Sequence, residues 1–165
     1  MTRLFVAVWP SERVLEELND LERPRDQGVK WLPAENLHIT LRFLGDADVD
    51  EVSDALDPVP LPRTHARLGP SIDVRAERSL MLPVAGVDDL ADVVGTATRG
   101  LGTERERRHF VGHLTLARLA RNARPSRSIG RLFEASFEVD TVALVASTLT
   151  NSRAVYETVG IWPTH

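Results

Sequence analysis

The chain has 165 residues, 42% of them hydrophobic and 27% charged, with a formal net charge of −4 at pH 7 and no cysteine. This length fits a single domain, because domains typically run ~100–200 residues. The absence of cysteine excludes a disulfide-stapled fold, a Cys-ligated zinc site and a thiol nucleophile, so the chemistry of this chain has to come from His, carboxylates, hydroxyls or Arg.

The N-terminal half alternates predicted strands and helices. Apolar β-branched runs favour strands, and apolar residues spaced three or four apart favour amphipathic helices. In chain order we expect a strand over Thr2–Trp9, a helix through Leu21 with Ser11 as its N-cap, strands over Val29–Leu32 and Leu37–Leu44, and a helix over Asp48–Leu56.

The C-terminal half is richer in strands and follows an extended connector over Pro58–Pro62. We expect a strand over Thr64–Arg75 interrupted near Gly69-Pro70, a strand over Ser79–Val84, a helix over Val87–Leu101, a strand over His113–Leu119, a short helix over Ser126–Phe133, and strands over Phe137–Thr148 and Ala154–Ile161. Strands and helices interleave without the regular spacing of βαβ units, so we expect an α+β fold with a mainly antiparallel sheet.

One four-residue motif occurs twice, as HITL from residue 38 and as HLTL from residue 113, each inside a predicted strand. Side chains alternate between the two faces of a strand, so His38 and Thr40 share one face, as do His113 and Thr115. A single strand His is most often structural, but two copies at matched parity favour a common site. If the two strands lie side by side, or are related by a pseudo-two-fold axis, the His-Thr pairs converge on one cleft.

Two imidazoles and two hydroxyls suit one type of reaction. With an unperturbed pKa of ~6.5, one His can be neutral and accept a proton from an attacking hydroxyl while the other is protonated and donates to a leaving oxygen. The Thr hydroxyls can hydrogen-bond the non-bridging oxygens of a phosphate, where charge has to be held in the transition state. The arrangement therefore predicts phosphate-ester chemistry without a metal.

On these residues the chain resembles the 2H phosphoesterase superfamily, in particular the bacterial RNA 2′,3′-cyclic phosphodiesterases also called 2′-5′ RNA ligases. The similarity follows the whole chain in order, and its specificity lies mostly in the two motifs and the run that contains the first. The passages that carry it are Leu4–Val8, Trp31–Gly45, His113–Arg118 and Ser147–Leu149 with Tyr156 nearby. One departure is Gly112, where such proteins often have Pro, and we expect it to loosen the start of the second motif strand.

The resemblance implies a bilobal α+β fold, with two antiparallel sheets backed by helices and one motif from each of two pseudo-symmetric lobes within a single domain of residues 1–165. It also implies metal-independent hydrolysis of RNA 2′,3′-cyclic phosphate ends to 2′-phosphomonoesters, with no cofactor. His38 and His113 would be the acid/base pair, in an order the sequence leaves open, and Thr40 and Thr115 the phosphate ligands.

Further residues are candidates for substrate contacts. Arg42 has the strand parity of His38 and is a candidate phosphate ligand, whereas Arg118 has the opposite parity from His113 and needs a bulge or a strand end to reach the phosphate. Arg153, in a predicted turn, and the aromatic residues Phe5 and Tyr156 are possible RNA contacts, although packing is the more common role for such aromatic residues.

Charge is distributed unevenly. The segment from Arg99 to Arg131 holds nine Arg against two Glu, a net +7, so the remainder of the chain carries −11. This basic segment is either a solvated face or a phosphate-binding one. We expect RNA ends or cyclic nucleotides as substrate, no obligate protein partner and a monomer. Because no apolar run approaches the ~18 residues of a membrane span, we also expect no membrane association and a cytoplasmic location.

Three alternatives remain open. The same two His could run the reaction toward 2′-5′ ligation, and a non-catalytic nucleotide- or RNA-binding module could keep the fold, although intact His and Thr in both motifs argue against the latter. The spacing of His109 and His113 also permits a metal site, but a Cys ligand is lacking and the duplicated motif already accounts for His113.

Overall fold

The computed structural model describes residues 1–76, 78–105, 109–125 and 127–165 and contains ten strands, three α-helices and one 3₁₀ helix in the described part of the chain. In order they are β1 (Thr2–Val8), α1 (Glu12–Asn19), β2 (Val29–Trp31), the 3₁₀ turn η1 (Ala34–Asn36), β3 (Ile39–Ala47), α2 (Val49–Leu56), β4 (Thr64–Leu68), β5 (Asp73–Arg75), β6 (Ser79–Ala85), α3 (Asp88–Ala97), β7 (His113–Leu119), β8 (Ala135–Val139), β9 (Thr141–Leu149) and β10 (Ala154–Pro163).

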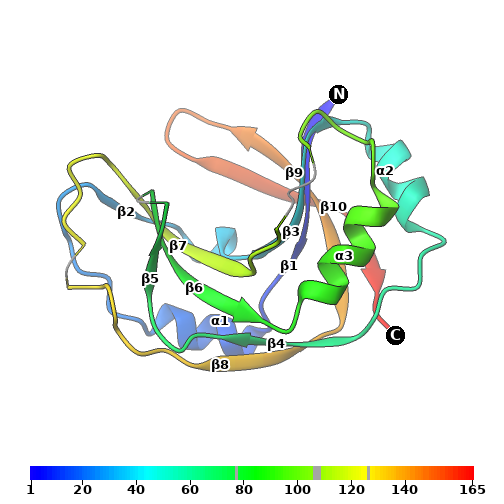
Figure 1. Ribbon diagram of the computed structural model, residues 1–165. Helices are drawn as coiled ribbons and strands as arrows, with labels where there is room; N and C mark the ends of the chain where they lie inside the picture. The colour runs from blue at the N-terminus through cyan, green and yellow to red at the C-terminus, as the bar shows by residue number, and fades with distance from the viewer. Residues whose placement is uncertain (77, 106–108, 126) are drawn as a thin grey trace.

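The strands form one curled, ten-stranded sheet in the order β10-β9-β1-β3-β7-β6-β4-β8, with β2 paired to β7 and β5 to β6 (Figure 1). Every strand pairing among the described residues is antiparallel. The α+β, mainly antiparallel class expected from the sequence is confirmed. The two expected sheets are joined into one, because β7 pairs with both β3 and β6.

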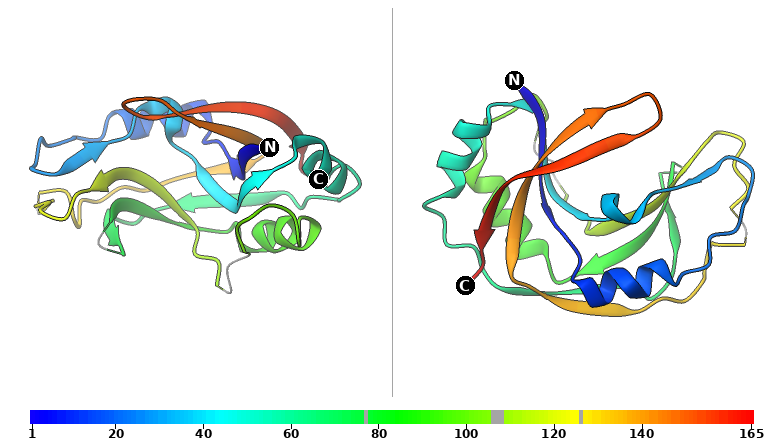
Figure 2. Two further views of the ribbon diagram at one scale, coloured as in Figure 1. Left: turned by 90° about the horizontal axis from the view of Figure 1, so that it is seen from above. Right: turned by 180° about the vertical axis from the view of Figure 1, so that it is seen from behind.

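The helices cover the ends of the curl. α1 packs against β8, α3 packs against β3, and α2 lies next to α3 and β10, as two further views show (Figure 2). The apolar faces of these helices and of the inner strands share one core, in which Leu4, Leu18, Ile39, Leu82 and Leu114 are fully buried. None of the helices in the described residues is both long enough and apolar enough to traverse a bilayer.

Local sequence signals explain most element boundaries. Ser11 caps α1 by accepting a hydrogen bond from the Val14 amide at 3.3 Å, and Asp48 caps α2 through the amides of Asp50 and Glu51. The helix predicted as far as Leu101 ends at Ala97, because Gly100 and Gly102 follow with positive φ of 80° and 77°.

Two predicted elements are wrong. The helix expected over Ser126–Phe133 begins outside the described residues. Residues 127–133 form turns and a bridge, because the Gly130 amide donates to the Ile72 carbonyl and the Arg131 carbonyl accepts from the Ile72 amide. The single strand expected over Phe137–Thr148 is broken at Asp140. Its first part, β8, pairs with β4, and its second part, β9, pairs with β1 and β10.

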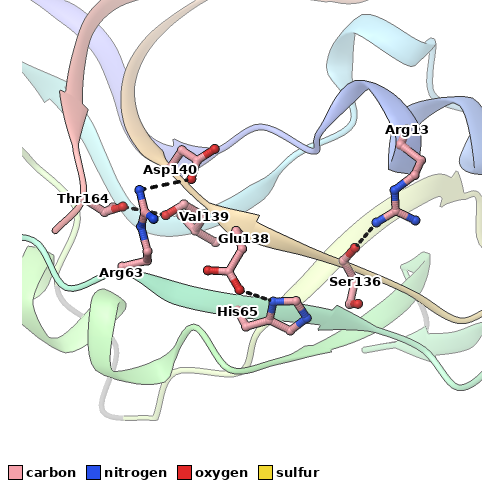
Figure 3. Close-up of polar contacts among 8 residues, drawn as sticks. All are labelled: Arg13, Arg63, His65, Ser136, Glu138, Val139, Asp140 and Thr164. Atoms are coloured by element: carbon pink, nitrogen blue, oxygen red, sulfur yellow. Dashed lines mark hydrogen bonds and ion pairs between the residues drawn. The ribbon is translucent and has the colours of Figure 1, made fainter.

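Polar contacts hold β8 on the outside of the molecule (Figure 3). Its neighbours come from α1, from β4 and the residue before it, and from the C-terminal end of the chain. The contacts are Arg13 Nη2 to the Ser136 carbonyl at 2.7 Å, His65 Nδ1 to Glu138 Oε1 at 2.7 Å, the Thr164 hydroxyl to the Val139 carbonyl at 2.6 Å, and Arg63 Nη2 to Asp140 Oδ1 at 3.5 Å.

Candidate active site

The two motif strands, β3 and β7, are direct neighbours in the sheet. Ile39 pairs with Leu114, and both side chains are fully buried on the core face. In each strand the His comes directly before the paired residue and the Thr directly after it. Because the strands are antiparallel, the register places His38 across from Thr115 and Thr40 across from His113. We name the sheet face that carries these four residues the motif face. The motif strands thus meet the condition, stated from the sequence, under which the two His-Thr pairs come together.

A β-bulge follows the Thr in each motif strand. Where β3 pairs with β1, Val6 is opposite Arg42 and Ala7 is opposite Thr40, which leaves Leu41 as the extra residue. Where β7 pairs with β6, Leu80 is opposite Ala117 and Met81 is opposite Thr115, which leaves Leu116 extra. An extra residue reverses the alternation of side chains beyond it. In both strands, the residue five positions after the His thus returns to the motif face.

The first bulge overturns the expectation that Arg42 shares the face of His38 and Thr40. Arg42 is 6% exposed, and its Nη2 donates to the Leu101 carbonyl at 3.4 Å, on the side where α3 ends. Phe43 takes the place on the motif face instead. Its ring lies 5.6 Å from the Phe5 ring, and the residue is 41% exposed, which leaves part of it accessible to a ligand.

The second bulge, at Leu116, reverses the alternation of side chains in β7 and so turns Arg118 to the motif face. Arg118 is exposed on the motif face, and its charge lies close enough to His38 to help lower the pKa of that imidazole. Phe43 and Arg118 thus occupy equivalent positions in the two strands, five residues after His38 and His113. The sequence reasoning missed Phe43, because strand alternation counted from His38 places it on the opposite face and only the pairing with β1 shows the bulge.

Both imidazoles are held in the same way. His38 Nδ1 lies 2.7 Å from the Asn36 carbonyl, and His113 Nδ1 lies 2.8 Å from the Val111 carbonyl. Because a carbonyl only accepts, Nδ1 carries the hydrogen in each ring, and the remaining proton-transfer atom is Nε2. His38 Nε2 lies 2.9 Å from Thr40 Oγ1, so the Thr40 hydroxyl donates to it when the ring is neutral.

His38 is embedded in an aromatic cluster. Its ring stacks on Phe5 at 4.8 Å and meets the edges of Tyr156 at 5.4 Å and Trp9 at 5.7 Å. Burial lowers the pKa of His38 to about 4, and the positive charges of His113 and Arg118 act in the same direction, against the raising effect of the bond to Asn36. His38 is therefore neutral at pH 7.

The three residues expected to contact RNA, Phe5, Tyr156 and Arg153, have different environments in the structure. Phe5 is 1% exposed beneath His38, so it packs the site and offers no surface to a base. Tyr156 is half-buried against Phe5 and His38. Arg153, which was expected to contact RNA, forms an ion pair with Glu35 at 3.1 Å, so its positive charge is paired with a carboxylate.

The β9–β10 hairpin reaches across to the segment that precedes His38. Besides the Arg153–Glu35 pair, Lys30 Nζ donates to the Ser152 carbonyl at 2.7 Å and Asn36 Nδ2 donates to the Ala154 carbonyl at 2.9 Å. Asn36 is 5% exposed and also holds His38 through its own carbonyl. The sequence reasoning missed Asn36, because no local signal predicts that its side chain meets a strand more than a hundred residues away.

The segment before the second motif is tighter than expected. A Cβ added at Gly112 would lie 2.3 Å from the Val84 carbonyl, and the Gly112 carbonyl accepts from the Val84 amide at 2.9 Å. Glycine thus permits a close approach of the two backbones rather than loosening the strand. His109 is exposed and lies before β7, so it does not share a strand face with His113. Arg107 and Arg108 of the basic segment lie outside the described residues.

The chain is similar in sequence to known proteins. The LigT like Phosphoesterase family matches residues 8–72, which contain the first motif. A protein of Methanocaldococcus jannaschii named RNA 2′,3′-cyclic phosphodiesterase is 25% identical over 97% of this chain and 99% of its own length. One of Aeropyrum pernix with the same name is 30% identical over 79% of this chain and 83% of its own.

The fold agrees as well. The crystal structure of the Thermus thermophilus protein TT0787 superposes with a TM-score of 0.78 and 26% identity, covering 98% of this chain and 97% of that one. The M. jannaschii protein and TT0787 thus match this chain over nearly their whole length. The chain belongs to the LigT-like phosphoesterase family, together with these RNA 2′,3′-cyclic phosphodiesterases.

Proposed function

We propose that this protein hydrolyses RNA 2′,3′-cyclic phosphate ends to 2′-phosphomonoesters, without a metal, by acid/base catalysis between His38 and His113. The observation that carries the proposal is the pair of imidazoles that both donate from Nδ1 to a backbone carbonyl, and so keep Nε2 for proton transfer on one sheet face. The names of the relatives support the substrate class.

The environment of His38 favours it as the general base. At pH 7 it is neutral, so its Nε2 can accept a proton from the attacking water. His38 Nε2 accepts from the Thr40 hydroxyl at 2.9 Å in the structure. When that hydroxyl turns to donate to a phosphate oxygen instead, the Nε2 lone pair becomes available to water.

His113 then takes the complementary role of general acid. The water oxygen forms a bond to phosphorus, the bond from phosphorus to O3′ breaks, and His113 gives its Nε2 proton to O3′. The products are a 3′-hydroxyl and a 2′-phosphomonoester, and one proton has moved from His113 to the leaving oxygen and one from water to His38. Thr40 and Thr115 stabilise the non-bridging oxygens, and Arg118 supplies positive charge beside them.

Phe43 completes the site as a surface for the nucleotide. Its partly exposed ring lies on the motif face, next to the Phe5 ring that supports His38. Stacking of a base on an aromatic ring is worth ~1–3 kcal/mol and tolerates any base. Phe43 rather than the buried Phe5 is therefore the aromatic residue that we assign to the substrate.

The test is an assay of purified protein in EDTA on a 2′,3′-cyclic nucleotide and on an oligonucleotide that ends in a 2′,3′-cyclic phosphate. We expect activity in EDTA, a 2′-phosphate product, and its loss in both His38→Ala and His113→Ala. His65→Ala is the matched control, because His65 pairs with Glu138 on the outside of the molecule (Figure 3) and should leave activity unchanged.

A requirement for added metal would refute the mechanism. Tight binding of the cyclic nucleotide without turnover would instead favour a binding module on the same fold.

A further inference from the structure

Three basic side chains form a row across the motif face. Lys30 of β2 is directly opposite Arg118 of β7, Arg118 is opposite Ser79 of β6, and Ser79 is opposite Arg75 of β5. Directly opposed residues of antiparallel strands point to the same face of the sheet. We call Lys30, Arg118 and Arg75 the cationic row. It crosses three strand spacings and is therefore about 14 Å long.

The cationic row begins beside the proposed reaction centre. Met81, opposite Thr115, is two residues from Ser79 on β6, so the row lies about 7 Å along the strands from Thr115. Two further observations place it on the same side as His38. The charge of Arg118 contributes to the low pKa of His38, and Lys30 reaches the Ser152 carbonyl in the β9–β10 turn.

The cationic row destabilises the sheet. Like charges directly across antiparallel strands are unfavourable, yet Lys30 and Arg118 are direct partners. Within the described ranges, no carboxylate lies within 4 Å of a charged nitrogen of any of the three, whereas Arg127 and Arg131 are each paired with a carboxylate.

The acidic residue on this face next to the row does not neutralise it. Asp73 is opposite Met81, one row closer to Thr115, and its Oδ1 accepts from the Val74 amide at 2.7 Å. Among the described residues of β2, β5, β6 and β7, one carboxylate thus shares this face with three cations. A row of positive charge that costs stability, and that leads away from a phosphate-binding centre, is what an extended polyanion would use.

We infer that the cationic row binds the phosphodiester backbone of the RNA strand that leads to the cyclic phosphate, and that the protein therefore prefers an oligonucleotide to a mononucleotide. This inference rests on the proposed function, since it takes Thr115 and its neighbours as the position of the terminal phosphate. Lys30 is the only lysine of the chain, and Arg75 comes from β5, outside the basic segment of the sequence. Only the strand register brings them into line.

The experiment measures binding and catalysis separately with Lys30→Gln/Arg75→Gln, in which Gln at residue 30 keeps a donor for the Ser152 carbonyl. Fluorescence anisotropy follows a labelled RNA hexamer that ends in a 2′-phosphate, over a series of salt concentrations. Two lost contacts should make the slope of log affinity against log salt shallower by about 1.4, since each contact with single-stranded nucleic acid contributes ~0.7. Hydrolysis of a 2′,3′-cyclic mononucleotide should keep its kcat/KM.

The control is Arg13→Gln/Arg63→Gln, which removes the same charge beside β8 (Figure 3) and should leave both readouts at the wild-type values. An unchanged salt slope in Lys30→Gln/Arg75→Gln, or an equal change in the control, overturns the inference. So does an equal loss on the mononucleotide, which would show that the two residues act at the reaction centre. If the wild-type protein hydrolyses neither substrate, the proposed function fails, whereas the salt slope still decides the role of the row.

Discussion

Burial of a neutral His38 should make the stability of this protein depend on pH. The pKa of His38 is lowered from 6.5 to about 4, mainly because burial penalises the charged imidazole. Above pH 6.5 the residue is neutral in both the folded and the unfolded chain and contributes nothing. Between pH 6.5 and 4 the unfolded chain binds a proton that the folded chain does not, so acidification favours unfolding.

The magnitude follows from the two pKa values. The full difference corresponds to about 3 kcal/mol, at ~1.4 kcal/mol per pKa unit, and is reached below pH 4. At pH 5 the unfolded chain is almost fully protonated at this position and the folded chain is not, which gives about 2 kcal/mol of lost stability relative to pH 7.

His38→Asn removes this contribution while keeping a donor near the position of Nδ1 for the Asn36 carbonyl. The measurement is urea unfolding of wild type and variant at pH 7, 6 and 5, compared as the difference in the free energy of unfolding at each pH. Other titrating groups are common to both proteins and cancel. We expect the difference to shift by about 2 kcal/mol in favour of the variant between pH 7 and pH 5.

His165→Asn, which removes an exposed imidazole at the chain end, should run parallel to the wild type. If His38→Asn also runs parallel to it, His38 is not held neutral by the fold, and the assignment of the general base loses its physical basis.

Three further predictions concern the site. Thr115→Val should lower kcat by ~100- to 1,000-fold while Thr115→Ser retains most activity, because a donor to the transition-state oxygens is lost only in the former; a loss below tenfold would contradict this role. Arg118→Gln should raise the pKa of His38 and move the acid limb of kcat/KM to higher pH, whereas an unmoved limb would show that this charge does not reach the base. Gly112→Ala should cost about 1–3 kcal/mol in thermal unfolding, because its Cβ would lie 2.3 Å from the Val84 carbonyl, and an unchanged Tm would show that β6 and β7 can separate freely.

Much of the site follows from local sequence. The repeated His-x-Thr-Leu pattern identifies His38, Thr40, His113 and Thr115. Side chains alternate between the two faces of any strand, and the His and Thr of each motif are only two positions apart, before the bulge interrupts the alternation. The same alternation, together with Gly, Pro and capping residues, predicts most strands, α1 and α2. It fails over residues 127–133 and at Asp140, where the backbone hydrogen bonds are made to distant segments.

The tertiary structure alone decided which residues beyond the motifs join them. Bulges at Leu41 and Leu116 turn Arg42 away and bring Phe43 and Arg118 onto the motif face. Each bulge is set by pairing with a partner strand, β1 or β6, and no residue in the motif itself specifies it. The low pKa of His38 and the alignment of the cationic row arise in the same way, since burial and cross-strand register depend on chain segments far apart in the sequence.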